Sequence, residues 1–344
     1  MSPLKQGSGC DTISVMETQS LIDASLSGYA LSREQCRAVL AWPDERLLLL
    51  LDAVGQVRQQ HFGRRVHVQV LSNAKSGLCP EDCHYCSQSR VSQADIETYP
   101  LVSEDQLLAE GRGARDQGAK RFCMALSGRK PSPAELDQLC DTVRTIKADT
   151  GLDLCGSLGL LNETDARRLK AAGLDRVNHN LNTSERFHPQ MCTTHTYQDR
   201  LDTIAACRAA GLEICSGGIV GLGETDEDVI DLLLALRAVR PESVPINFLI
   251  PVPGTPFEDR AMDLTPVRCL KILCLARLLI PDREIRAAGG REHHLRSLQP
   301  LALLAANSIF VDGYLTTGGQ SLEAARGMIA DLGFELDTPE PRHD

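Results

Sequence analysis

Three cysteines lie within eight residues in the segment SGLCPEDCHYCSQSR, which spans residues 76–90. They are Cys79, Cys83 and Cys86, and no fourth cysteine follows nearby. A structural zinc ion wants four tetrahedral ligands, and His84 is awkwardly placed for closing the same site. A four-iron cubane fits more easily, because three thiolates bind three irons and leave the fourth open to a substrate or cofactor. The spacing therefore predicts a [4Fe-4S] cluster with a functional open position.

Three more cysteines occupy matching places in short apolar stretches. Cys123, Cys155 and Cys215 fall in RFCMAL, DLCGSLG and EICSGGIV. Side chains of a strand alternate between the two faces of a sheet, so thiols at corresponding positions can converge inside a barrel. Each thiol alone is more often core filling, but together they suggest a second iron-sulfur site. The remaining cysteines receive no role: Cys10, Cys36, Cys140, Cys192, Cys207, Cys269 and Cys274.

The segment NHNLNTS carries three asparagines at alternate positions, Asn178, Asn180 and Asn182. In a strand these three side chains share one face. Amides are poor strand formers and costly to bury without partners, so this face is expected to meet a polar ligand in the lumen. The alternative is structural, with the amides capping strand ends and bonding loop backbone.

These candidate residues are positioned by a regular alternation of short apolar runs and longer helical patterns from residue 66 onward. Several of the helical segments end at a glycine, which favours a helix C-terminus. Eight such runs predict an α/β fold of the (βα)8 TIM-type barrel class, with the chemistry in the loops at the carboxyl ends of its strands. Residues 1–62 are expected to form an N-terminal helical extension, residues 63–335 the barrel and residues 336–344 a disordered tail. The eight runs are VHVQVLS, RFCMAL, DLCGSLG, RVNHNLN, EICSGGIV, SVPINFLI, EIRAAGG and NSIFVDG.

Composition narrows the class of protein. The chain has 344 residues, 13 cysteines and a formal net charge of −10, and it shows no basic stripe of the kind that binds nucleic acid. The apolar run LLLLL at residues 47–51 is too short to span a bilayer, and the first 20 residues lack the pattern of a secretion signal. We therefore expect a cytoplasmic protein whose thiols are reduced and bind metal or do chemistry.

The pattern C-x3-C-x2-C with Tyr85 before the last cysteine resembles the radical S-adenosylmethionine (SAM) enzymes. In that superfamily the open iron binds SAM, an electron from the cluster cleaves it, and a 5′-deoxyadenosyl radical takes hydrogen from the substrate. Over about residues 65–335 the resemblance narrows to the biotin synthase family, which inserts sulfur into dethiobiotin. It is carried by KSGLCPEDCHYCSQS, RFCMA, YQDRLDT, CSGGIVGLGET, ESVPIN and AGGRE.

The resemblance implies roles for individual residues. A [2Fe-2S] cluster that donates sulfur would be held by Cys123, Cys155, Cys215 and Arg286, although a buried arginine by default forms a salt bridge. Tyr85 would lie beside the SAM adenine and Arg200 would bind the SAM carboxylate. Asn180 and Asn182 would contact the SAM ribose or the dethiobiotin ring, and Asn247 the substrate.

Partners and alternatives also follow from the resemblance. A flavodoxin or ferredoxin is expected to supply electrons, although no sequence feature marks its docking site, and a homodimer is expected. One alternative is another radical SAM enzyme of related design, of the hydrogenase-maturation or methylornithine type, which would not need all four residues of the second cluster. The other is a non-catalytic iron-sulfur or zinc protein.

Overall fold

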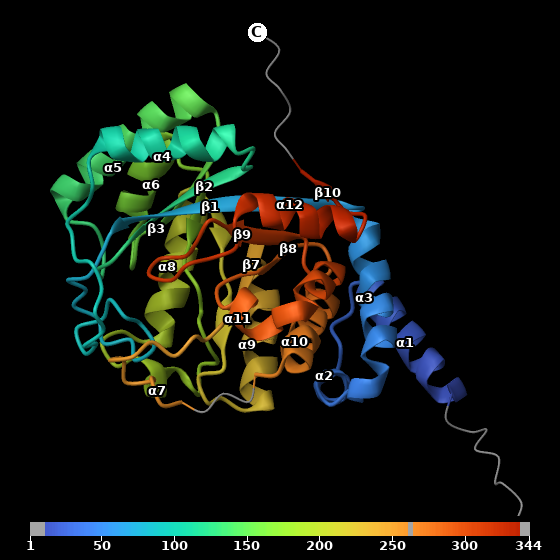
Figure 1. Cartoon of the computed structure of the whole chain (residues 1–344). Coiled ribbons are helices and arrows are strands. Elements are labelled where there is room, and N and C mark those ends of the chain that lie inside the picture. The colour runs from blue at the N-terminus through green and yellow to red at the C-terminus, as the bar shows by residue number, and fades with distance from the viewer. Residues whose placement is uncertain (1–10, 261–263, 338–344) are drawn as a thin grey trace, which may run out of the picture.

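A closed barrel of parallel strands forms the centre of the molecule in the computed structural model, which describes residues 11–260 and 264–337 (Figure 1). Neighbouring strands follow the order β10-β1-β2-β3-β4-β5-β7-β8-β9, with β6 paired to β7. Pairing of β1 with β9 closes the barrel. The strands are β1 Arg65–Lys75, β2 Arg121–Leu126, β3 Asp153–Ser157, β4 Arg176–Asn178, β5 Glu213–Cys215, β6 Gly218–Val220, β7 Ser243–Phe248, β8 Glu284–Ala287, β9 Ser308–Val311 and β10 Glu335–Leu336.

Helices alternate with these strands and surround the barrel, so the predicted (βα)8 fold is confirmed. Most begin at a serine, threonine or asparagine whose side chain accepts a bond from the helix backbone, as Ser132 does from Glu135. Glycines in the left-handed conformation end α5 and α6, at Gly151 and Gly173. The helices are α4 Glu104–Asp116, α5 Pro133–Thr150, α6 Glu163–Ala172, α7 His188–Met191, α8 Tyr197–Ala209, α9 Asp226–Val239, α10 Pro266–Leu279, α11 Arg291–Leu295, η2 Arg296–Leu304 and α12 Leu322–Asp331.

An N-terminal group of helices packs against the outside of the barrel beside α10 (Figure 1). It comprises α1 Asp11–Leu26, α2 Arg33–Leu40, η1 Asp44–Arg46 and α3 Leu47–Phe62. In the leucine run that opens α3, Leu50 and Leu51 are fully buried while Leu48 is exposed, as the helical period requires. Because these helices cover the outer side of α10, every residue of α10 from Cys269 to Leu279 is buried. Within the described residues, no helix has the length and apolar character needed to cross a membrane.

The expected division of the chain into an N-terminal extension, a barrel and a C-terminal tail stays a prediction, because parts of both termini are not described. Residues 1–10, including Cys10, and residues 338–344 of the expected tail lie outside the described residues. Leu336 of the same expected tail pairs with Val66 of β1.

The fourth and fifth strand runs are shorter than their sequence patterns suggest. Strand β4 ends at Asn178, so Asn180 and Asn182 lie in the loop beyond it rather than in a strand. The backbone turns at Asn182, which has φ +72°, a left-handed conformation that asparagine tolerates better than most residues. The fifth run is broken into β5 and β6 at Gly217, where an added Cβ would lie 1.8 Å from the Pro245 carbonyl oxygen. Close approach of β7 therefore requires glycine at this break.

Candidate active site

A cavity of about 410 Å³ opens at the carboxyl ends of the barrel strands. Its wall combines thiols, amides and two guanidinium groups, those of Arg129 and Arg200. Because polar groups that converge in an enclosed pocket are typical of ligand sites, this cavity is the candidate active site. The residues expected to have a function that line it are Cys79, Cys83, Tyr85, Cys86, Cys123, Cys155, Asn178, Asn180, Asn182, Arg200 and Asn247.

The three-cysteine segment lies in the loop between β1 and α4, which is the position predicted from the sequence. The loop is fixed by two carboxylates that separate its first two cysteines. Glu81 bonds Arg129 at 3.0 Å and Thr194 at 2.5 Å, and Asp82 accepts bonds from the backbone N–H groups of Thr193 at 2.9 Å and of Thr194 at 3.2 Å. Both are more than 90% buried, so the cysteine loop is held rigidly against the loop that follows α7.

The deeper thiols come from three barrel strands, as expected. Cys123 of β2 and Cys155 of β3 are partners in the parallel register, which places their side chains next to each other. Cys215 ends β5, and its sulfur lies 3.3 Å from the Asn178 amide nitrogen and 3.7 Å from Arg286 Nη1. Cys215 and Arg286 lie below the cavity surface, so they form its floor rather than its wall.

Arg286 is buried at the floor with 1% of its surface exposed. Its Nη2 forms an ion pair with Glu284 at 2.5 Å and donates to Ser243 Oγ at 2.9 Å, and its Nε donates to Ser308 Oγ at 3.1 Å. The salt bridge expected by default is therefore present. Nη1 nevertheless remains directed at the Cys215 thiol, so an ion pair and a contact with the thiol set coexist.

At the floor, neighbouring charges and hydrogen bonds act on the pKa values of the side chains alongside burial. Burial disfavours the charged form of Arg286, but the Glu284 carboxylate outweighs it and raises the pKa of Arg286 above the usual range. A hydrogen bond from Cys155 lowers the pKa of the Cys123 thiol, and the charge of Arg286 acts in the same direction. At the mouth, burial instead raises the pKa of Cys86 to about 11. Of the three floor thiols only Cys123 is shifted downward, because the bond to Cys123 and burial raise the pKa of Cys155 and burial raises the pKa of Cys215.

The asparagine side chains agree in part with both interpretations of their pattern, the ligand-binding one and the structural one. Asn180 Oδ1 accepts from the backbone of Gly217 at 3.0 Å, and Asn247 bonds the backbone of Gly218 and Gly289, each at 3.0 Å. These bonds orient the side chains structurally, while all of the amides still face the cavity. Among the described residues, the Asn180 amide nitrogen has no hydrogen-bond partner, so this donor is available to a ligand.

Tyr85 and Arg200 also line the cavity. Tyr85 OH accepts a bond from Asn182 Nδ2 at 2.9 Å. Arg200 Nη1 donates to the carbonyl oxygen of Asn180 at 2.8 Å, and its Nη2 lies 2.7 Å from His195 Nε2. Arg200 is thus a positioned cation on the cavity wall, suited to an anionic ligand group.

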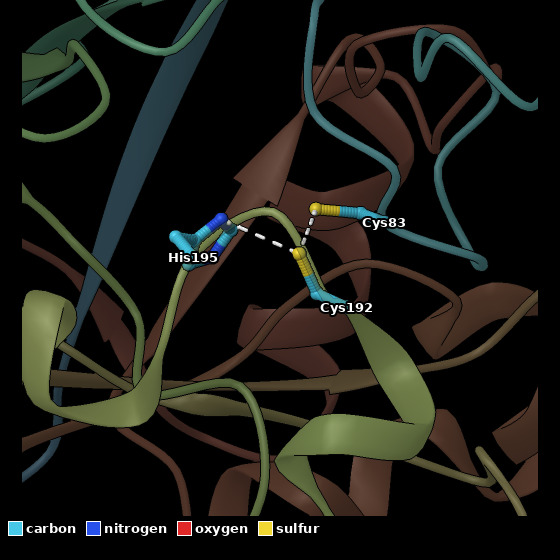
Figure 2. A group of neighbouring side chains, drawn as sticks. All are labelled: Cys83, Cys192 and His195. Carbon is cyan, nitrogen blue, oxygen red and sulfur yellow. Dashed lines mark hydrogen bonds between the residues drawn. The ribbon is translucent and has the colours of Figure 1, made fainter.

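Sequence reasoning missed a buried group behind the cysteine loop. Figure 2 shows Cys192 between Cys83 and His195, with the two sulfurs 3.7 Å apart. The signal was available, because PEDC places two carboxylates beside the motif and HPQMCTTHT places a thiol and an imidazole three residues apart. Only the fold shows that the two segments meet.

Comparison with known proteins gives two matching family models. One described as the radical SAM superfamily matches residues 75–236, and one described as the biotin and thiamin synthesis associated domain matches residues 245–335. Among solved structures, a methylornithine synthase superposes with a TM-score of 0.81 at 20% identity, covering 92% of this chain and 97% of that one. A hydrogenase maturase from Carboxydothermus hydrogenoformans gives a TM-score of 0.79 at 18% identity, covering 94% and 80%. These structures share the fold with the chain.

Curated relatives extend over almost the whole chain. A biotin synthase of Bacillus subtilis (strain 168) is 47% identical over 320 residues, which are 93% of this chain and 95% of the relative. A biotin synthase of Acaryochloris marina is 50% identical over 298 residues, covering 87% of this chain and 86% of the relative. Because identity at this level spans both chains nearly in full, the chain belongs to the biotin synthase family.

Proposed function

We propose that the protein is a radical SAM enzyme that inserts sulfur into dethiobiotin to form biotin. The observation that supports this most directly is that five thiols line one cavity. Cys79, Cys83 and Cys86 lie at its mouth, while Cys123 and Cys155 lie toward its floor. An enzyme that needs one metal centre to start a reaction and a second to complete it requires both on a common lumen.

The donor sets fit two iron-sulfur clusters. Cys79, Cys83 and Cys86 would hold a [4Fe-4S] cluster, and Cys123, Cys155, Cys215 and Arg286 would hold a [2Fe-2S] cluster. When bound, the first would supply the electron that cleaves SAM and the second would supply the sulfur atom. The fit rests on thiol number and on burial: the second set is more than 90% buried and directs Arg286 Nη1 at a thiol.

The residues between the two sets would bind and orient the organic molecules. Arg200 would pair with the SAM carboxylate, since a held guanidinium at a cavity wall binds carboxylates well. Tyr85 would contact the adenine. Asn180, Asn182 and Asn247 would present amide groups to the ribose or to the ureido ring of dethiobiotin. Enclosure by the barrel would exclude water from the reacting carbons.

An anaerobic assay tests the proposal. Reconstituted protein receives a reductant, SAM and dethiobiotin, and both 5′-deoxyadenosine and biotin are measured. Formation of both products supports the function. Formation of 5′-deoxyadenosine without biotin would refute the substrate, and absence of both would refute the reaction class. Iron and sulfide counts per chain separate this proposal from a related radical SAM enzyme with a single cluster.

Partners and location complete the proposal. A flavodoxin or ferredoxin would supply the electrons, the enzyme would act as a homodimer, and it would work in the cytoplasm. The use of cysteines in a metal-binding spacing agrees with a reducing compartment. Sedimentation of the purified protein tests the dimer.

A further inference from the structure

We propose that Cys83, Cys192 and His195 form a binding site for a single zinc ion in the cluster-free protein. The three residues come from two loops, and their ligand atoms all lie within 4.8 Å of one another. Figure 2 shows the three side chains directed at a common point. The site shares Cys83 with the three-cysteine motif but draws its other ligands from outside it.

The distances match a tetrahedral zinc site. With zinc–sulfur bonds of about 2.3 Å and zinc–nitrogen bonds of about 2.0 Å, the edges of a tetrahedron are about 3.8 Å between sulfurs and about 3.5 Å between sulfur and nitrogen. The structure has 3.7 Å between the sulfurs of Cys83 and Cys192, and 3.3 Å between Cys192 Sγ and His195 Nδ1. The third distance, between Cys83 Sγ and the His195 ring nitrogen, lies within 4.8 Å, so zinc binding needs these two side chains to approach by at most about 1.3 Å. Two thiolates and one imidazole leave the fourth position to water.

The surroundings of the three ligands are typical of a built site. Cys192 is 1% exposed and His195 is 7% exposed. Cys192 packs in an apolar cluster that contains Phe187, Met191, Leu222, Leu249 and Phe257. Asp82 Oδ1 accepts a bond from the Cys192 thiol at 3.2 Å in the metal-free protein. Zinc binding ends this bond because a thiolate has no proton to donate, and Asp82 keeps its bonds from the backbone N–H groups of Thr193 and Thr194.

Zinc binding has a defined proton balance. Any protons that the two thiols carry leave to solvent, and the imidazole proton moves from Nδ1, where it faces Glu81 at 2.5 Å, to Nε2. Arg200 must then release its 2.7 Å contact with Nε2, and it keeps its bond to the Asn180 carbonyl. Glu81 keeps Arg129 and Thr194 as partners. Glu81 and Asp82 thus keep hydrogen-bond donors, and Arg200 keeps a carbonyl acceptor.

Sharing of Cys83 makes zinc and the proposed [4Fe-4S] cluster mutually exclusive. This consequence rests on the proposed role of Cys83, whereas zinc binding itself rests on geometry alone. Bound zinc is expected to slow cluster assembly until it is removed.

The test uses the full-length cluster-free chain, reduced and anaerobic, titrated with zinc against a chromophoric chelator. We expect one zinc per chain. Removing an outer contact of a metal site costs about 10- to 100-fold in affinity, so Cys192→Ala and His195→Ala, which remove ligands, should each cost at least about 100-fold. Cys207→Ala, which removes a buried thiol from α8, is the matched control and should leave affinity unchanged. X-ray absorption should show two sulfur neighbours.

Cys79→Ala separates the two possible thiol sets. If zinc binds as proposed, this variant retains wild-type affinity, because Cys79 is not a ligand. Loss of zinc in Cys79→Ala together with wild-type affinity in Cys192→Ala would assign zinc to the motif cysteines and overturn the proposal. Cys192→Ser, which keeps the side-chain volume, should lose zinc as Cys192→Ala does while circular dichroism shows a native fold. Wild-type protein that binds zinc but makes no biotin would refute the proposed function and leave the zinc site intact.

Discussion

Replacement of Arg286 by methionine tests the floor of the barrel most directly. Methionine fills much of the arginine volume but removes the cation that pairs with Glu284 at 2.5 Å. It also removes the donors to Ser243 Oγ and Ser308 Oγ. The cost should therefore come from a buried carboxylate that has lost its main partner.

The size of this cost follows from what Glu284 retains. Deleting one member of a buried ion pair typically costs about 3–5 kcal/mol, because the other charge stays buried. Glu284 still has Arg176 Nη1 at 3.5 Å and Arg121 Nη1 at 3.8 Å. Ser243 Oγ also continues to donate to it at 2.9 Å. We expect the lower end of the range, about 3 kcal/mol.

Urea unfolding of the cluster-free chain under reducing conditions measures the effect. The midpoint should fall while the slope stays constant, since the folded state keeps its surface. Arg144→Met is the control, because this arginine pairs with Asp141 at the surface and its side chain is 57% exposed. Its cost should stay within about 0.5 kcal/mol.

A double-mutant cycle with Glu284→Gln isolates the pair. Neutralising Glu284 in the Arg286→Met background should restore part of the lost stability, because the unpaired charge disappears. An unfolding free energy of Arg286→Met equal to wild type, or a coupling near zero, would refute the claim that these residues stabilise each other at the floor.

Three further predictions concern other parts of the molecule. Cys79→Ala should abolish the [4Fe-4S] absorbance and SAM cleavage; retained SAM cleavage would argue against a ligand role. Gly217→Ala should lower the free energy of unfolding by about 3 kcal/mol, because the new Cβ would lie 1.8 Å from the Pro245 carbonyl oxygen. The control Gly113→Ala has open space around the new methyl group, so it should stabilise α4 by up to about 1 kcal/mol in thermal melts. Asp228→Asn should destabilise the fold by about 2 kcal/mol at pH 7. Burial acts to raise the pKa of Asp228, but hydrogen bonds from Ser184 and Thr225 outweigh it and lower that pKa. The Asp228 carboxylate therefore stabilises the fold fully above the unfolded pKa near 4, and this stabilisation is lost as pH falls through the folded pKa. If the difference in melting temperature between wild type and Asp228→Asn does not shrink on acidification, the explanation is wrong.

The barrel and the place of its thiols could be predicted because both depend on local patterns. Parallel strands in register align residues at matching positions, so assigning RFCMAL and DLCGSLG to neighbouring strands was enough to bring Cys123 beside Cys155. The pairing of Arg286 with Glu284 is similarly local, because residues two apart in a strand share a face.

Contacts between distant loops could not be predicted in the same way. The strand pattern of NHNLNTS suggested that β4 continues to Asn182, but the chain turns there because its backbone bonds Gly217 and Ile219 across the break in the fifth strand. Likewise, the meeting of Cys192 with Cys83 joins residues 109 positions apart. Such pairings depend on how two loops fold over the barrel mouth, and neither loop carries a periodic signal of it.

The charge of the floor links these local features to the chemistry. In the described part of the chain, the floor beneath the thiols contains three buried arginines, Arg121, Arg176 and Arg286, against one buried carboxylate, Glu284. Two other acidic partners, Asp153 and Glu213, have side chains 41% and 48% exposed, so solvent screens their charge. The interior is therefore left with excess positive charge. The charge of Arg286 acts to lower the pKa of both Cys123 and Cys215, although burial still keeps the pKa of Cys215 above its usual value. The buried arginines therefore offset part of the cost that burial imposes on a thiolate at this floor.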